Sequence, residues 1–201
     1  MTTLTGGTRP SSSKASQRRR AAIEEATRVL LRAHDAAEVS VSDIARQAEV
    51  SVATVYNLVG TRNRLLARVL DGYVNRLAVE LADRPPAGGL EHTAVAVVTA
   101  AVDAAMNDPL PLRAVLRELG PLDLEQTKGT GVDDLIAPRL RAAGASEREA
   151  REAARLIVYA FRGTLVSWAH GLISDARFRA DTELVTRRLA MATFCGTDQG
   201  T

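Results

Sequence analysis

The chain has 201 residues, enough for one large domain or two small ones, and 46% of them are hydrophobic, which is ample for a buried core. The net charge of +2 conceals an asymmetry, because residues 1–75 hold 11 basic and 7 acidic side chains whereas residues 76–201 hold 15 and 17. A basic first part and a mildly acidic second part suit a nucleic-acid-binding domain joined to a different domain. Cys195 is the single cysteine, which excludes an intrachain disulfide.

The sequence shows neither a signal peptide nor a membrane span. Its start is rich in Thr, Gly and Ser and lacks the apolar core of a signal peptide. The most apolar run, residues 156–173, contains Arg162 and His170, so we expect a buried helix there. A cytoplasmic protein without a membrane partner is therefore expected.

The first 16 residues are polar and show no apolar periodicity, so we predict a disordered basic arm over 1–16. The charges up to residue 20 are all positive: Arg9, Lys14, Arg18, Arg19 and Arg20. Such a run is either a solvated tail or, before a DNA-reading unit, a set of phosphate or minor-groove contacts. A first long helix is then expected from about Gln17 to His34, because apolar residues recur on one face.

The stretch 40–66 predicts two short capped helices followed by a longer one. Ser40 and Asp43 have the spacing of a capping box, in which each side chain binds a backbone N–H at the start of a helix. Ser51 is a second N-cap candidate, and apolar residues follow it at helical spacing. Two short helices joined by a turn are typical of a helix-turn-helix, whose second helix enters the major groove of DNA.

These residues resemble the DNA-binding domain of TetR-family transcriptional regulators. In that family a helix ending in "IA..AGVS" precedes a recognition helix of the form "TLYYYF" and then "SK"; this chain has Ile44-Ala45, Val50-Ser51, Thr54-Val55-Tyr56 and Thr61-Arg62. It departs from the pattern with Glu49 in place of Gly, Leu58-Val59 in place of the aromatic ending, and Arg62 in place of Lys. The resemblance implies an all-α protein with a three-helix helix-turn-helix domain over 17–66 and a helical ligand-binding and dimerisation domain over 67–201.

The helix dipole, arginine charges and hydroxyl groups are expected to hold phosphates, while the tip of the second helix faces bases. The predicted phosphate contacts are Arg18, Arg19, Arg20, Ser42, Arg46, Thr54, Tyr56, Thr61 and Arg62, with Ser51 at the N-cap, and the predicted base contacts are Val52, Ala53, Thr54 and Asn57. Since no Lys or Arg lies between Arg46 and Arg62, the helix cannot make the common bidentate contact to guanine. We therefore predict an A·T-rich core in each half-site, with any guanine read by Arg46 or Arg62.

Beyond residue 60 the pattern is helical, without strand-like alternation. Helices are expected from Thr61 to about Leu81, over Leu90–Asn107, Leu110–Leu119 and Val132–Ala143, from a capping box at Ser146 to Ile173, and over Thr182–Cys195, with a loop at 120–131. The apolar stripes on the last two helices predict a homodimer interface through Ile157, Phe161, Leu165, Trp168, Leu172 and Leu189.

TetR-like proteins usually hold a small-molecule cavity among their middle helices, so the resemblance implies an effector, which the sequence does not identify. The candidate lining residues are Met106, Val115, Leu116, Leu119, Tyr159, Phe161, Arg162 and Trp168. Each of them also suits an ordinary helical core. Arg162 stands apart, because a charge amid apolar neighbours needs a partner or an anionic group on a ligand.

The sequence contains few residues in an arrangement that is typical of an enzyme active site. Ser167, His170 and Ser174 lie three and four residues apart with Asp175 next to them, but no G-x-S-x-G elbow accompanies them. The histidines are too scattered for a metal site, and the stretch 128–131 lacks the arrangement of a phosphate-binding loop, so no cofactor is expected.

The sequence thus predicts a ligand-responsive transcriptional regulator, a repressor that binds palindromic double-stranded DNA as a homodimer. Two alternatives stay open. One is a structural DNA-binding protein without a ligand, and the other is a helical-bundle enzyme that uses Ser167 and His170.

Overall fold

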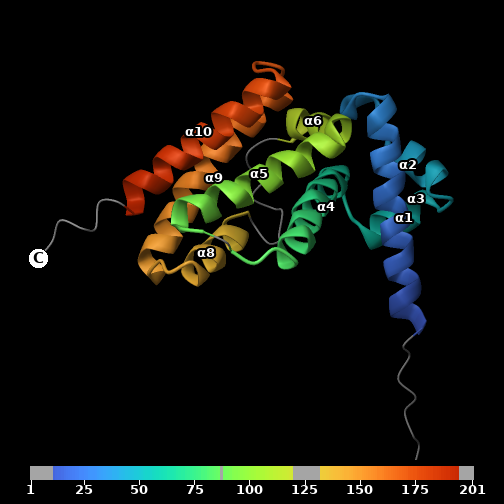
Figure 1. Cartoon of the computed structure of the whole chain (residues 1–201). Helices are drawn as coiled ribbons and strands as arrows, with labels where there is room; N and C mark the ends of the chain where they lie inside the picture. The colour runs from blue at the N-terminus through green and yellow to red at the C-terminus, as the bar shows by residue number, and fades with distance from the viewer. Residues whose placement is uncertain (1–10, 87, 120–131, 195–201) are drawn as a thin grey trace, which may run out of the picture.

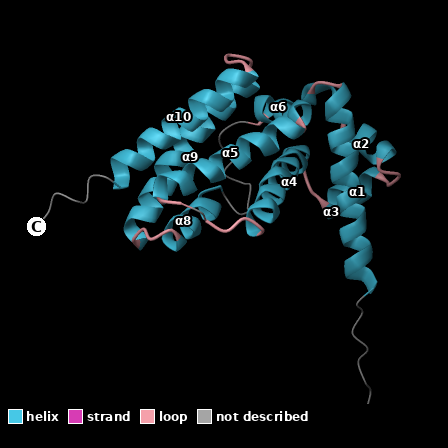
Figure 2. Cartoon of the chain, in the orientation of Figure 1, coloured by secondary structure: helices cyan, strands magenta, loops and turns pink. Residues whose placement is uncertain are grey.

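The computed structural model describes residues 11–86, 88–119 and 132–194. These residues form α-helices and one short 3-10 helix, with no strand among them (Figure 2), so the predicted all-α fold is confirmed. The helices are α1 (Ser11–Ala33), η1 (Ala36–Glu38), α2 (Val41–Gln47), α3 (Val52–Leu58), α4 (Arg62–Ala82), α5 (Leu90–Asn107), α6 (Pro109–Glu118), α8 (Val132–Ala142), α9 (Glu147–Ala169) and α10 (Asp175–Phe194). The predicted loop at 120–131 and residues 1–10 of the predicted arm lie outside the described residues.

The helices form an N-terminal group and a C-terminal group, with α4 and α6 between them (Figure 1). In the first group, α1, α2 and α3 pack with the start of α4 through buried apolar side chains such as Ile23, Ile44, Val55 and Leu65. In the second group, α10 lies against α5 and α9, and α8 lies against α9. The fully buried ring of Trp168 is the largest side chain in this part of the core.

Four helices begin at the capping residues that the sequence predicts. Ser40, Ser51, Thr61 and Ser146 each accept a hydrogen bond from the backbone N–H three residues on, and two of these caps are complete capping boxes. At α9 the Glu149 carboxylate accepts in turn from the Ser146 backbone N–H at 3.0 Å, and these hydrogen bonds lower the pKa of Glu149. Helix α5 has the predicted bounds of Leu90 and Asn107.

Two helices begin earlier than predicted. α1 starts at Ser11 and not near Gln17, so residues 11–16 are helical and do not belong to a disordered arm. Adding a residue to a formed helix costs little, because each one brings a hydrogen bond and needs no buried face. α10 starts at Asp175 and not near Thr182, because Ser174 caps it by accepting from the Arg177 N–H at 3.2 Å.

Three helices end in the same hydrogen-bonded turn, a Schellman motif, which places one residue in the left-handed conformation. The closing bonds run from Val50 N to Ala45 O at 3.0 Å, from Ala145 N to Leu140 O at 3.0 Å and from Leu172 N to Ser167 O at 2.9 Å. The left-handed residues are Gly144 after α8 (φ 107°), Gly171 after α9 (φ 74°) and Glu49 after α2 (φ 54°). A glycine adopts this conformation without strain, whereas Glu49 does not.

Arginine side chains from neighbouring helices bind the free carbonyl groups at other helix ends. Arg117 of α6 donates from Nε to the Ala169 carbonyl at 2.6 Å, at the end of α9. Arg139 of α8 donates to the Leu81 carbonyl near the end of α4. The last four carbonyl groups of a helix have no partner within the helix, so these contacts satisfy them and join the helices.

The N-terminal group is tied to α6 by hydrogen bonds to Asp108 and Glu118. Arg32 of α1 makes a two-pronged ion pair with Asp108, with N–O distances of 3.0 and 2.7 Å. Tyr73 of α4 donates its hydroxyl to the Asp108 carbonyl at 2.6 Å. Burial, and then the negative charge of Asp108, raise the pKa of Tyr73 to about 12.

Candidate nucleic-acid interface

The α2–α3 pair is built from two short helices that are each fixed at the start. The Asp43 N–H donates to Ser40 Oγ at 3.1 Å, and the hydrogen bonds that Ser40 returns lower the pKa of the Asp43 carboxyl. In α3 the Thr54 N–H donates to Ser51 Oγ at 3.1 Å. The side chains of Ile44 and Val55 are buried, so the pair is anchored on the core and its other side is left free.

That free side of α3 carries the predicted base contacts. Val52 is 38% exposed and Tyr56 is 52% exposed, and Ala53 and Asn57 are exposed beside them. A small apolar tip followed by an amide is therefore presented outward, as the sequence predicts. Thr54 is half-buried, and its hydroxyl lies 2.8 Å from Ser51 Oγ, so it belongs to the cap of the helix.

Polar groups for phosphate binding surround α3. Ser42 and Thr61 are exposed, although Thr61 Oγ1 also accepts from the Arg64 N–H at 3.3 Å as the cap of α4. The Arg46 side chain is 78% exposed and pairs with Asp43 at 2.5 Å. An exposed pair of this kind is weak, so Arg46 can exchange its partner for a phosphate or a guanine.

Arg62 does not point outward as a DNA contact. Its guanidinium donates to the Ala36 carbonyl, to the Val39 carbonyl at 3.3 Å and to Glu118 at 2.7 Å. The side chain thus connects α4 to η1 and α6, and its contact with a phosphate or a flanking guanine stays a prediction. A charged group that is already held by these acceptors has few donors left for DNA.

The predicted arginine cluster of residues 18–20 lies on α1. Arg18 and Arg19 are exposed, and no hydrogen bond joins them to other described residues. Arg20 is half-buried and donates from Nε to the Leu58 carbonyl at 3.1 Å, at the end of α3. Arg18 and Arg19 thus remain candidates for phosphate contacts, whereas Arg20 also holds the end of α3.

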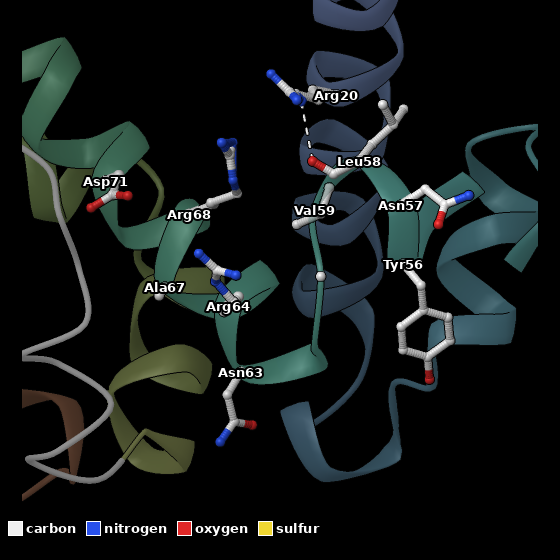
Figure 3. A pocket seen from close by; sticks show the side chains of 11 residues that line it. Arg20, Tyr56, Asn57, Leu58, Val59, Asn63, Arg64, Ala67, Arg68 and Asp71 are labelled. Atoms are coloured by element: carbon white, nitrogen blue, oxygen red, sulfur yellow. Dashed lines mark hydrogen bonds between the residues drawn. The ribbon is translucent and has the colours of Figure 1, made fainter. Parts of the chain in front are cut away.

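A hollow of about 450 Å³ lies between α1, the end of α3 and the start of α4 (Figure 3). Arg20, Arg64, Arg68 and Asp71 line it. Arg64 and Arg68 are not among the predicted contacts. The signal for them in the sequence is a pair of arginines four residues apart in the helix that follows the recognition helix, a spacing that places both on one face.

The predicted effector residues divide into two sets. Val115, Leu116, Leu119, Phe161 and Trp168 are buried and Met106 is half-buried, so these side chains lie in the interior of the C-terminal group. Tyr159 is 62% exposed and Arg162 is exposed, so neither lines an interior cavity of the monomer. The expectation that the Arg162 charge needs a buried partner is wrong for the same reason.

The predicted dimer residues are mostly core residues of the monomer. Ile157 and Trp168 are fully buried, Phe161 is 5% exposed, and Leu165 and Leu189 are half-buried, so a monomer does not leave them facing water. Leu172 is 76% exposed. The outward apolar side chains of these helices are instead Tyr159 and Val166 on α9 and Leu184 and Met191 on α10. Their spacing of seven residues along each helix is the sequence signal for this second stripe.

Ser167, Ser174 and Asp175, which belong to the enzymatic alternative, have structural partners. Ser167 donates its hydroxyl to the Gly163 carbonyl at 2.8 Å within α9. Ser174 caps α10, and Asp175 accepts from Trp168 Nε1 at 2.7 Å and from Arg113 at 2.7 Å. These contacts assign no catalytic arrangement to Ser167, His170 or Asp175.

Among the described helices, none is long and apolar enough to cross a membrane. No known family model matches the sequence. No curated protein matches it significantly either.

Solved structures do resemble this chain. A TetR transcriptional regulator from Rhodococcus sp. RHA1 matches 92% of the chain and 100% of its own, with a TM-score of 0.72 and 20% identity. The TetR family repressor AlkX from Dietzia sp. strain DQ12-45-1b, which is implicated in biodegradation of n-alkanes, matches 85% of the chain and 94% of its own, with a TM-score of 0.56 and 23% identity. The chain therefore has the fold of the TetR-family transcriptional regulators.

Proposed function

We propose that the protein is a DNA-binding transcriptional regulator, a repressor that acts as a homodimer in the cytoplasm and responds to a small-molecule effector. The observation that carries the proposal is the outward face of α3, where Val52, Ala53, Tyr56 and Asn57 are exposed on a helix fixed by its cap and its buried face. The resemblance of the fold to TetR-family regulators supports it.

The proposed base reading follows from the chemistry of that face. The methyl groups of Val52 and Ala53 suit the methyl group of thymine, and the Asn57 amide can donate to and accept from adenine. With Arg62 held by η1 and α6, Arg46 is the remaining predicted arginine for a flanking guanine. Tyr56 is too bulky to share the tip and is assigned to a phosphate.

The proposed homodimer uses the outward face of α9 and α10. Tyr159, Val166, Leu184 and Met191 are large apolar side chains that water reaches in the monomer, and such a face marks an interface. Gly163 lies between Tyr159 and Val166 on α9, and nothing lies within 4 Å of the position that its Cβ would take, so a partner helix can approach closely there. Two α2–α3 pairs in a twofold dimer would read a palindromic site.

The proposed effector cavity lies where α6 meets α9. The buried residues Val115, Leu116 and Leu119 of α6 and Phe161 and Trp168 of α9 belong to this region. The same helix α6 holds Arg62 through Glu118, on the side of the N-terminal group. A ligand that moved α6 would therefore change how the reading heads are held, and both half-sites must fit together for tight binding.

Selection of binding sites from random DNA, followed by affinity measurements on the selected site, tests this proposal. Asn57→Ala should lose about 1–3 kcal/mol of binding free energy and relax one A·T position. Tyr56→Phe should weaken binding to all sequences alike, because a phosphate contact carries no base information.

Asn75→Ala on the exposed surface of α4 is the matched control and should bind like the wild type. A chain that selects no sequence, or an Asn57→Ala variant with unchanged preference and affinity, would refute the proposed function.

A further inference from the structure

The hollow between α1, α3 and α4 is lined by more positive than negative charge. Arg20, Arg64 and Arg68 line it against one acidic lining residue, Asp71. In Figure 3 the guanidinium groups of these arginines lie on one side of the segment 58–60, while Tyr56 and Asn57 point to the other side. Tyr56 and Asn57 also line the hollow, so it adjoins the face of α3 that is proposed to read bases.

The arginines of this hollow have N–H groups that donate to no described residue. Within the described residues, the Arg64 side chain has no hydrogen-bond or ion-pair partner, although it lines a concave site. Arg20 uses Nε for the Leu58 carbonyl at 3.1 Å, and its terminal amino groups donate no hydrogen bond to the part of the chain that the structure describes. Arg68 is held by one ion pair, from Nη1 to Glu24 at 3.0 Å, and keeps its other amino group.

The arginines of the hollow outnumber its acidic groups. Glu24 is engaged by Arg68 at 3.0 Å, and Asp71 is the acidic residue that lines the hollow. Burial raises the pKa of both carboxyl groups. The arginine charges persist at every physiological pH. The hollow therefore offers three guanidinium groups against one lining carboxyl group.

We propose that this hollow binds a phosphate-bearing anion, a small phosphorylated molecule that is held by Arg20, Arg64 and Arg68. Guanidinium groups bind phosphate oxygens through paired N–H donors, which is the geometry that the free amino groups supply. A space of about 450 Å³ is within the range of small-molecule sites. The bound anion would join α1 to α4 beside the last turn of the recognition helix, at a place separate from the proposed effector cavity.

The experiment measures binding of pyrophosphate to the DNA-free protein by calorimetry, at constant ionic strength set with sodium chloride. Pyrophosphate should bind, and Arg64→Gln should weaken it about tenfold, because a charge-assisted contact of that size is lost. Since Arg64 has no side-chain partner among the described residues, the variant should fold like the wild type. Asp71→Asn should tighten binding, because it removes the acidic group that lines the site.

Arg155→Gln, an exposed arginine of α9, is the matched control for the change in charge and should leave pyrophosphate binding unchanged. Equal binding by the wild type and Arg64→Gln would overturn the proposal, as would no binding at all. If pyrophosphate fails to bind but Arg64→Gln weakens DNA binding and flattens its salt dependence, the phosphate belongs to the DNA backbone and the proposal of a free ligand is also overturned. Because no DNA is present in the first measurement, its result does not depend on the proposed function.

Discussion

Buried threonine hydroxyl groups in this core differ in whether a backbone carbonyl of their own helix accepts a hydrogen bond from them. Thr27 and Thr186 are both fully buried threonines within helices. Thr27 donates to the Ile23 carbonyl at 2.8 Å, four residues earlier, which is the usual partner of a helical threonine. Thr186 has no hydrogen-bond partner among the described residues, so its hydroxyl is buried at a cost.

Replacing Thr186 by Val should therefore raise the free energy of unfolding by about 1 kcal/mol, because the shape is kept and an unpaired polar group is removed. The same change at Thr27 should lower it by about 1 kcal/mol, since a hydrogen bond is lost there. Urea titrations of the two variants and the wild type give both values. A destabilised Thr186→Val protein would show that the hydroxyl has a partner, such as a buried water molecule.

At the scale of the helix, α2, α8 and α9 end in the same Schellman turn, but its left-handed residue is a glycine in two of them and a glutamate in the third. Gly144 and Gly171 adopt positive φ freely, whereas Glu49 adopts φ 54° with a side chain. The left-handed conformation costs a non-glycine residue about 1–2 kcal/mol, and glycine loses about 0.5–1 kcal/mol more backbone entropy on folding. The difference favours glycine at this turn.

Glu49→Gly should then stabilise the protein by up to about 1 kcal/mol, measured as a higher midpoint of thermal unfolding. Gly144→Glu is the mirror control and should destabilise it by a similar or larger amount. Nothing lies within 4 Å of the position of a Cβ at Gly144, so the effect there comes from the backbone and not from a clash. A Glu49→Gly protein that melts earlier would mean that the carboxylate makes a contribution larger than the strain.

Helix starts could be predicted from the sequence because a cap is a local contact. Ser40, Ser51 and Ser146 act on N–H groups three residues away, so the pattern contains the whole interaction. Arg62 could not be placed in this way, because its partner Glu118 lies 56 residues further along the chain. The local sequence pattern predicted a DNA contact for Arg62 and gave no sign of this tertiary contact.

The two apolar stripes of α9 could not be told apart from the sequence either, because the distinction depends on contacts with other helices. The sequence shows that the helix is apolar on more than one side, but periodicity alone does not say which stripe covers the core of the monomer. Ile157, Phe161 and Trp168 form the inner, buried stripe. Phe161 and Trp168 contact Phe178 of α10, whose ring stacks on Trp168 with a centroid distance of 4.9 Å. The outer stripe is therefore the one to test for assembly.

At the scale of the whole molecule, the exposed stripe predicts how the proposed dimer can be separated. Val166→Glu with Leu184→Glu places charges on the outer face of α9 and α10 without changing the core. Association should weaken by more than about a hundredfold, since an unpaired charge buried at an interface costs several kcal/mol. Analytical ultracentrifugation should find monomers that keep the helical circular dichroism of the wild type.

Val79→Glu is the control, because Val79 is 69% exposed on α4, away from that face, and the variant should remain a dimer. If the double variant still dimerises like the wild type, another surface forms the interface. Glutamate at Leu165 or Leu189 would be a poorer choice, because both side chains are half-buried in the monomer and the fold itself would suffer.

The contact between the N-terminal group and α6 should resist alkaline pH, because of the kinds of donor that form it. Its donors are the guanidinium groups of Arg32 and Arg62 and the phenol of Tyr73, without a lysine among them. Guanidinium groups keep their proton far above the range in which lysine loses it. The phenol has a pKa of about 12 in the folded protein against an ordinary value of 10.0, so its contribution to stability is complete below pH 10 and is lost as the pH rises through about 12. In mild alkali this contact should therefore stay intact, and between pH 10 and about 12 it should lose the contribution of the phenol while the arginine pairs remain.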